Sequence, residues 1–286
     1  MGDERVFSIL ISTWNNLDLL KITIGSLKKN SAYLHQIIVH VNEGNDGTVG
    51  WLRDNGIEYT YTKLNVGACY SRNICSSLAE CEYVLLSEDA NYFCPGWDMH
   101  LLSAVKEQKD DFWCISATSI KHSPTNERSV IAPYYFGDSA ESFNEQLLLV
   151  GFDQLPFDNW TGINRQALLL KRIIWSAIGG LSVEFNPGAS SDTDLAMKLW
   201  TLGVRLFWGI ANSRVYHIGK QEARIAKQNN GERKFLQKWG ISTGTFLTYY
   251  ITGDSMQPGQ RSVPFSVSMK DFLLRLWHDS RHVRGY

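Results

Sequence analysis

Several features are scarce or missing in this chain of 286 residues, and each absence narrows its function. Lys and Arg form no long run and the formal net charge is −1, so we expect no nucleic-acid partner held by bulk electrostatics. No stretch reaches the roughly 18 to 20 apolar residues that a membrane span needs. The start, Met1 to Arg5, lacks the pattern of a signal peptide, which predicts a cytoplasmic protein.

The cysteines are few, and their spacing indicates no disulfide pairs. They are odd in number and show no C-x-x-C spacing, so we expect reduced, partly buried thiols and neither a disulfide framework nor a zinc site: Cys69, Cys75, Cys81, Cys94 and Cys114. The hydrophobic fraction of 44% and charged fraction of 20% are those of an ordinary globular protein. The aromatic fraction of 12% suits grooves for bases and sugars, although aromatic residues more often fill cores.

One stretch organises the predicted fold. Glu82 to Leu86 has the pattern of a buried strand, and Glu88 and Asp89 follow where that strand ends, shortly before the turn Pro95-Gly96-Trp97. Ligands of open α/β sheets bind at the carboxyl ends of strands, so paired acids there are placed to hold a divalent cation or to act as acid and base. A solvated acidic turn is the plainer alternative.

Strands alternate with helices through the first hundred residues, which predicts a doubly wound nucleotide-binding half. The expected strands are 6–13, 36–41, 57–62 and 82–86, and the expected helices are 17–29, 48–55 and one that begins after Asn65 and ends near Ala79. Arg72 lies near the start of that last helix, where the helix dipole favours anions, so a phosphate or an acidic partner nearby would explain it.

The second half continues with a helix at 101–108, a strand at 112–118 and an irregular segment at 121–153 that reads as loops and edge strands. Asp192 and Asp194 open a helix that ends before Gly203, where helix capping alone would account for both acids. Two strand segments follow, at 205–209 and 213–219, and His217 lies near the end of the second.

These motifs, in this order, resemble glycosyltransferase family 2. They are the strand ending in Ser12-Thr13-Trp14-Asn15, the loop Asn45-Asp46-Gly47-Thr48, the segment Asn65-x-Gly67 to Arg72-Asn73, and the strand-end acids before Pro95-Gly96-Trp97. The resemblance implies a GT-A fold: α/β, with a Rossmann-like, mostly parallel sheet flanked by helices and a C-terminal extension on the acceptor side. It also implies an inverting hexosyltransferase-type enzyme that uses a nucleoside-diphosphate sugar and Mn²⁺ or Mg²⁺.

The resemblance carries site roles onto this sequence. It places around the nucleotide Thr13, Trp14, Asn15, Asn42, Asn65, Gly67, Arg72 and Glu88. It places at the metal Asp89, Asn91 and His217, and around the donor or acceptor sugar Trp160, Thr161, Gly162 and Asp194. Asp192 matches the general base, a role the chemistry requires because an acceptor hydroxyl is a poor nucleophile until its proton is taken.

Residues 1–219 are predicted to form the catalytic domain, with a nucleotide-binding half at 1–100 and an acceptor half at 101–219. Residues 220–286 form a C-terminal helical extension or lid. Cations in its first part would reach the diphosphate or cover a solvated helix face: Lys220, Arg224, Lys227 and Arg233. An amphipathic helix near Met269 to Trp277 either docks on the main domain or pairs two chains in a homodimer.

The sequence departs from the family at Ser87-Glu88-Asp89, where acids separated by one residue are usual, and at Ser191, where Glu is usual. Two alternatives to a transferase therefore stay open, a non-catalytic nucleotide-sugar-binding module and a sugar nucleotidyltransferase. The acceptor is a glycan or a lipid-linked molecule that would bring the protein to a membrane periphery, and the expected pathway is polysaccharide or surface-glycan synthesis. Neither the sugar nor the nucleotide follows from the residues.

Overall fold

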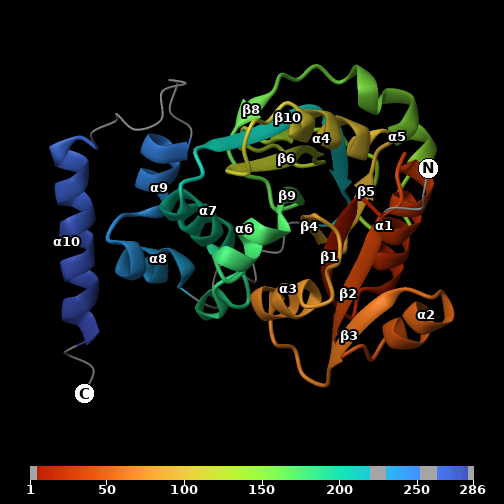
Figure 1. Ribbon diagram of the computed structural model, residues 1–286, viewed down its shortest axis with the longest axis horizontal. Helices are drawn as coiled ribbons and strands as arrows, with labels where there is room; N and C mark the ends of the chain where they lie inside the picture. The colour runs from red at the N-terminus through yellow and green to blue at the C-terminus, as the bar shows by residue number, and fades with distance from the viewer. Residues whose placement is uncertain (1–4, 220–229, 252–262, 283–286) are drawn as a thin grey trace.

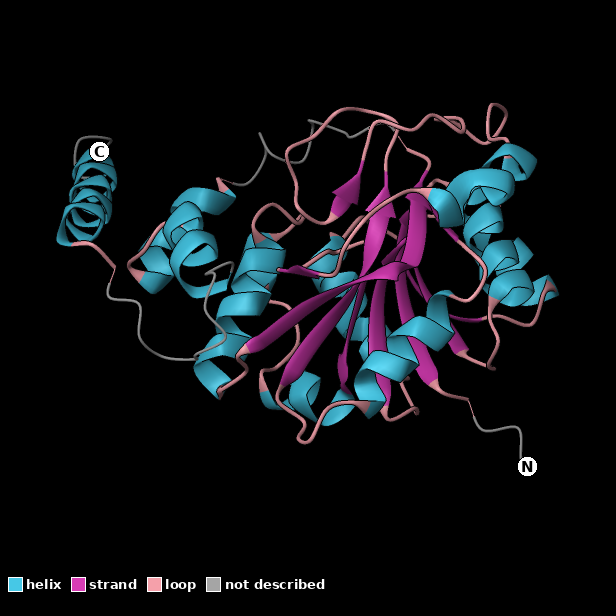
Figure 2. Ribbon diagram, turned by 90° about the horizontal axis from the view of Figure 1, so that it is seen from above, coloured by secondary structure: helices cyan, strands magenta, loops and turns pink. Residues whose placement is uncertain are grey.

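Helices lie on both faces of one sheet in the computed structural model, which describes residues 5–219, 230–251 and 263–282 (Figures 1 and 2). The sheet has ten strands, and its main path runs β3-β2-β1-β4-β9-β6-β10-β5, while β7 pairs with β6 and β8 pairs with β10. This mixed α/β architecture confirms the predicted fold class.

The predicted alternation of the first half is confirmed. Its elements are β1 (Phe7–Trp14), α1 (Leu17–Asn30), β2 (Gln36–Asn42), α2 (Thr48–Asp54), β3 (Glu58–Thr62), α3 (Ala68–Ser76) and β4 (Tyr83–Glu88). The strands β3, β2, β1 and β4 are parallel to one another, so their carboxyl ends lie at one edge. Helix α3 ends at Ser76, three residues before the predicted Ala79.

The second half is less regular. Its elements are β5 (Asn91–Phe93), α4 (Trp97–Lys106), β6 (Trp113–Ile120), β7 (Val130–Ile131), α5 (Glu145–Gly151), η1 (Phe152–Gln154), β8 (Trp160–Thr161), β9 (Ala167–Lys171), α6 (Arg172–Ala177), η2 (Val183–Phe185), α7 (Ser191–Leu202) and β10 (Leu206–His217). The predicted helix at 101–108 starts earlier, at Trp97, because Gly96 with φ of 78° turns the chain directly into it. The two predicted strand segments at 205–219 are one strand with an irregularity between Ile210 and Arg214.

Strand β9 reverses the direction of the sheet locally. It is antiparallel to both β4 and β6, and β10 is parallel to β6. The carboxyl ends of β4 and β10 and the amino end of β9 therefore share the edge at which β1 and β2 end.

Successive residues of the strands face opposite layers, as the strand pleat requires. Ile9 and Ile11 pack in a core with α1, α2 and α4, whereas Leu10 packs in a second core with α3, α6 and α7. Burial of each such side chain stabilises the fold by about 1.5–3 kcal/mol. The two cores hold the sheet edge in place from both sides.

The C-terminal region adds α8 (Gly231–Trp239), α9 (Thr243–Phe246), η3 (Leu247–Ile251) and α10 (Phe265–His282). Phe235 and Phe246 pack in the same core as Leu195 and Leu199 of α7, so α8 and α9 widen one face of the sheet. The part of the predicted lid at 220–229, with Lys220, Arg224 and Lys227, lies outside the described residues. No helix among the described residues is long and apolar enough to cross a membrane.

Candidate active site

Residues distant in sequence meet at the edge where the parallel strands end. Trp14 lies beside Asn42 in the register of β1 and β2, and β4 runs parallel to β1 on the other side. His217, at the end of β10, lies beside Asn91 of β5. The predicted nucleotide and metal residues of β1, β2, β4, β5 and β10 therefore share one edge.

Asp89 directly follows β4 and is half-buried. The Thr23 hydroxyl of α1 donates a hydrogen bond of 2.9 Å to its backbone carbonyl, which fixes the chain at this point. Burial raises the pKa of the Asp89 carboxyl to about 6, and the charge of Glu88 adds to the rise, while the polar side chains of Thr13 and Asn16 offset part of it. A desolvated carboxylate of this kind favours a cation beside it.

Glu88 is committed to an ion pair. The Nη2 atom of Arg72 donates to Glu88 Oε1 at 2.8 Å and to the Ser87 carbonyl at 3.2 Å, and Arg72 is buried. Burial opposes ionisation of Glu88, but Arg72, helped by Arg165, lowers its pKa to about 2. Glu88 is thus the acidic partner that the position of Arg72 predicted. The Nε atom of Arg72 is buried and has no hydrogen-bond partner among the described residues.

Half-buried His217 and buried Asn91 form a polar pair beside these acids. His217 Nδ1 lies 3.3 Å from Asn91 Oδ1, and the Asn91 amide nitrogen donates to Ser87 Oγ and to the Gln166 carbonyl. Burial lowers the pKa of His217 to about 4, so its imidazole is neutral at neutral pH. Neutral imidazole is the form that binds a metal.

Asp192 lies in the first turn of α7. Burial raises its pKa and Glu88 adds to the rise, while the guanidinium groups of Arg165 and Arg72 act against it. These couplings place Asp192 in the same electrostatic cluster as Glu88, and a raised pKa suits a group that must accept a proton.

Arg165 was not predicted. It precedes β9 and keeps solvent-exposed surface, and burial opposes its charge, but Glu88 and Asp192 raise its pKa. Its position depends on the antiparallel β9, whose amino end comes to this edge. The one available signal was a cation directly after the predicted sugar loop at 160–164.

Trp14 and Asn15 form an exposed corner after β1. The Trp14 side chain is 56% exposed and its Nε1 donates to Glu43 Oε2 at 2.9 Å. Asn15, with φ of 48°, accepts a hydrogen bond from the Asn45 backbone at 2.8 Å. Thr13 is buried next to this corner, and its hydroxyl makes no well-aligned hydrogen bond within the described structure.

Three other predicted nucleotide residues support the loops of this edge. Asn42 is buried, its Nδ2 donates to the Thr13 carbonyl at 3.2 Å, and its Oδ1 accepts from Val66 N at 2.9 Å. The Asn65 side chain accepts from Gly67 N at 2.9 Å. Gly67 has φ of 79°, and a Cβ there would lie 2.6 Å from the Asn186 side chain, so only glycine fits. The Asn42 amide is therefore occupied within the protein.

The predicted sugar loop is only partly open. Trp160 is buried, and its Nε1 donates to Thr118 Oγ1 at 2.9 Å. Its ring fills the space over Gly209, where a Cβ would lie 1.8 Å from it. Gly162 is buried as well, whereas Thr161 is exposed. Trp160 thus shapes the sheet, and Thr161 is the member of this loop that faces solvent.

The structure also corrects the position of Asp194, which was expected at the sugar. Its carboxylate is fully buried and accepts hydrogen bonds from Ser182 Oγ at 2.6 Å and Trp239 Nε1 at 2.8 Å. Lys238 Nζ lies 2.9 Å from it. Asp194 therefore points from α7 into the protein, where its contacts with Trp239 and Lys238 link α7 to α8.

Comparison with known sequences agrees with this geometry. A family model described as glycosyl transferase family 2 matches residues 8–173, more than half of the chain. The chain belongs to this family. The matched span includes β1 to β4, with Asp89, and ends just after β9.

This family 2 chain is also similar to an uncharacterised protein, y4gI, of Sinorhizobium fredii, with 26% identity over 229 residues. It covers 73% of this chain, and the chain spans 24% of the length of that relative.

Solved structures share the GT-A fold. GalNAc-T7 with UDP, GalNAc and Mn²⁺ gives a TM-score of 0.57 at 12% identity, covering 99% of this chain and 58% of its own. Residues 1–349 of TarS from S. aureus give 0.60 at 11% identity, covering 97% and 73%. The mannosyltransferase PcManGT from Pyrobaculum calidifontis with GDP-Man and Mn²⁺ gives 0.51 at 13% identity, covering 95% and 70%.

The donor set of this family 2 chain suits a cation that shares its ligands with a substrate. Within 5–219, 230–251 and 263–282 no group of three His, Cys, Asp or Glu side chains gathers as a closed metal site. Asp89 and neutral His217 offer two donors, and small divalent cations commonly complete their coordination with substrate phosphates and water. The residues present therefore fit Mn²⁺ or Mg²⁺ held together with a diphosphate.

Proposed function

We propose that this chain transfers a sugar from a nucleoside-diphosphate sugar to an acceptor hydroxyl, with inversion at the anomeric carbon and dependence on a divalent metal. The observation that supports this most is the position of two desolvated carboxylates, Asp89 after β4 and Asp192 at the start of α7. Both lie near enough to Glu88 for its charge to raise their pKa, and Arg72 and Arg165 act on Glu88 and Asp192. The chemistry needs two separate acidic groups, one near the leaving diphosphate and one near the acceptor.

Asp192 is the proposed general base. Its carboxylate takes the proton of the acceptor hydroxyl as the oxygen attacks the anomeric carbon, and the bond from that carbon to the diphosphate oxygen breaks on the opposite face. A single displacement of this kind inverts the configuration. Because burial raises the pKa of Asp192, it accepts this proton more readily than an exposed Asp does.

Asp89 and His217 would hold the divalent cation, which when bound neutralises charge on the leaving diphosphate. Arg165 keeps exposed surface in the same cluster and is free to approach a phosphate. Arg72 holds the Glu88 side chain in place through its ion pair. Trp14, whose ring is exposed at the end of β1, is placed to contact the nucleotide.

The donor and the acceptor class belong to the same proposal. Structures with this fold were solved with UDP, UDP-GlcNAc and GDP-Man, so uridine and guanosine diphosphate sugars are the first donors to test. We infer that the acceptor is a glycan or a lipid-linked molecule in polysaccharide or surface-glycan synthesis.

A non-catalytic nucleotide-sugar-binding module is the second candidate. It is favoured by the commitment of Glu88 to Arg72, which leaves one carboxylate after β4 for a metal. A module of this kind needs no base, so Asp192 distinguishes it from an enzyme.

A thermal-shift panel tests the proposal first. UDP, GDP, dTDP and CMP are each added with and without Mn²⁺, since a ligand that binds only the folded state raises the melting temperature with its affinity. We expect one nucleoside diphosphate to give a shift that grows with Mn²⁺, and its sugar conjugate to be hydrolysed or transferred. Binding without turnover by the wild type would support the module, and no shift at millimolar ligand would overturn both candidates.

A further inference from the structure

Helix α10 exposes a continuous apolar stripe. Five side chains form it, with exposed fractions of 78%, 39%, 55%, 56% and 49%: Phe265, Met269, Phe272, Leu273 and Leu276. Isolated exposed apolar residues are ordinary, but a contiguous set on one helix marks an interaction surface. In Figure 1, α10 lies at the far end of the molecule from the sheet edge, so this stripe is separate from the candidate active site.

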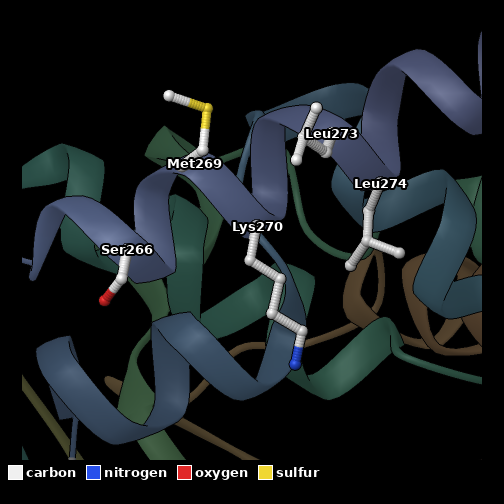
Figure 3. Close-up of a pocket in the computed structure, with 5 residues that line it drawn as sticks. All are labelled: Ser266, Met269, Lys270, Leu273 and Leu274. Atoms are coloured by element: carbon white, nitrogen blue, oxygen red, sulfur yellow. The ribbon is translucent and has the colours of Figure 1, made fainter.

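The opposite side of α10 faces the body of the protein. Asp271 is 2% exposed, and its Oδ2 accepts a hydrogen bond from Ser242 N at 3.1 Å. Leu274 is half-buried on the same side. Figure 3 shows Met269 and Leu273 projecting from one side of the helix and Lys270 and Leu274 from the other. The docked side fixes the orientation of α10 and directs the stripe outward.

The spacing of the stripe identifies the kind of partner. Phe265, Met269, Phe272 and Leu276 follow one another at intervals of four, three and four residues, and Leu273 lies beside them. At 100° per residue the five side chains fall within about 100° of the helix circumference. A narrow stripe with this alternation is the seam by which one helix packs against another.

We propose that the stripe packs against the same stripe of a second copy of this chain, with the two α10 helices antiparallel about a twofold axis. The axis passes between residues 270 and 271, so Met269 of one copy meets Phe272 of the other, and Phe265 meets Leu276. Each pair joins an aromatic ring to a flexible or branched aliphatic side chain, and sulfur contacts with aromatic rings are favourable. A parallel pair would instead oppose like residues, with Phe265 against Phe265.

The charges and the area fit this occupant. Neither cation at positions 265–276 of α10 lies within the stripe, because Arg275 lies beside Gly240, 3.6 Å from the position of a Cβ there, and Lys270 projects on the side of Leu274 (Figure 3). The net charge of −1 gives two copies little mutual repulsion. Joining two stripes removes on the order of 1,000 Å² from water, which is the lower limit for a specific interface. The pairing is therefore reversible and depends on concentration.

Analytical ultracentrifugation of the full chain tests the proposal. We expect the weight-average mass to rise from 32.5 kDa toward twice that value between about 1 and 100 µM. Met269→Lys and Phe272→Asp should each keep the mass at that of one copy, because both residues are exposed and their replacement leaves the fold intact by circular dichroism. Val150→Asp, at an exposed apolar residue of α5, is the matched control and should pair like the wild type.

Mixing the two variants tests the antiparallel register. In a mixed pair the introduced lysine faces the introduced aspartate once, and Met269 faces Phe272 at the other contact, so we expect the mixture to recover the doubled mass. Pairing by the single variants, or a mixture that stays at the single mass, overturns the arrangement. A wild type that stays at 32.5 kDa at 100 µM, including one that instead sediments with vesicles of phosphatidylcholine and phosphatidylserine, overturns the proposal.

Discussion

The acids after β4 and the acids of α7 form two pairs that are built alike. In each pair one acid is held in an ion pair within the protein, Glu88 by Arg72 at 2.8 Å and Asp194 by Lys238 at 2.9 Å. The other acid of each pair, Asp89 or Asp192, has no such partner among the described residues, and burial raises its pKa. Each region thus holds one carboxylate in an ion pair and leaves the other without one, as the proposed function requires.

The two acids of each pair have different partners because their side chains point in different directions. Glu88 is the last residue of β4 and Asp89 the first after it, so the two side chains leave the sheet differently. Asp194 lies two residues after Asp192 in α7, which places the two on different sides of that helix. A charge that is satisfied inside the protein fixes the loop or helix, and its neighbour is then held in a position where it can act on a ligand.

The largest expected effect is on turnover. Asp192→Asn should lower kcat by about 10³-fold, since a general base contributes about 10² to 10⁴, while the Kd for the donor nucleotide changes less than about twofold. Transfer or donor hydrolysis and thermal shift measure the two quantities. Asp194→Asn is the matched control in the same helix. If Asp192→Asn keeps the full kcat, Asp192 is not the general base.

The next largest effect is on the free energy of unfolding, at Glu88, the ion-paired acid at the end of β4. Glu88→Gln should lower the free energy of unfolding at pH 7 by about 2 kcal/mol, because it leaves Arg72 buried without a counter-charge. The pKa of Glu88 is about 2 in the folded chain and ordinarily 4.5, so its contribution is present above pH 4.5 and lost as the pH falls toward 2. The cost should therefore shrink in urea denaturation at pH 3.

Glu80→Gln controls for loss of a surface ion pair, because the Glu80 side chain is 67% exposed beside Arg5. It should change the stability little at any pH. An equal cost from Glu80→Gln and Glu88→Gln would contradict the structural assignment of Glu88.

A smaller loss is expected at the second pair. Asp194→Asn should lower the free energy of unfolding by about 1–2 kcal/mol, since the amide keeps a hydrogen-bond acceptor but no longer balances Lys238, which is 29% exposed. Its kcat should stay within about threefold of the wild type at a temperature where both are folded. Glu184→Gln, the more exposed partner of Lys238, should cost less. If Asp194→Asn loses kcat but keeps its stability, Asp194 acts at the sugar site after all.

The smallest change should have the opposite sign. The pKa of Asp89 is about 6 in the folded chain and ordinarily 3.8, so the folded state favours its protonated form, and this contribution to stability is lost as the pH rises through 6. Asp89→Asn should therefore raise the free energy of unfolding by about 1 kcal/mol at pH 8 with chelator present, and change it little at pH 4. The Mn²⁺-dependent part of the nucleotide thermal shift should disappear. Destabilisation at pH 8 would contradict a desolvated Asp89.

Much of the first half could be predicted because its signals are local. Buried parallel strands are continuous apolar runs, and the polar residues that follow them must come to the same edge, which predicted the place of Glu88 and Asp89. Thr13 and Trp14 were assigned by the resemblance to the family. The strand β5 was missed because short edge strands carry little pattern, and the start of α4 at Trp97 was missed because it depends on the left-handed turn at Gly96. Arg165 was missed because its place depends on the reversed strand β9.

The sequence by itself determined the order of helices and strands from β1 to β4, the family, and the two places along the chain where acids follow a strand or open a helix. Only the tertiary structure decided which acid of each pair is available, because that depends on Arg72 and Lys238, which the chain brings from other elements. It also decided that α10 turns its apolar side outward, since the periodicity of a helix gives the stripe but not the face that docks. Local patterns fix elements, whereas ion pairs and docking surfaces depend on contacts between residues far apart in the chain.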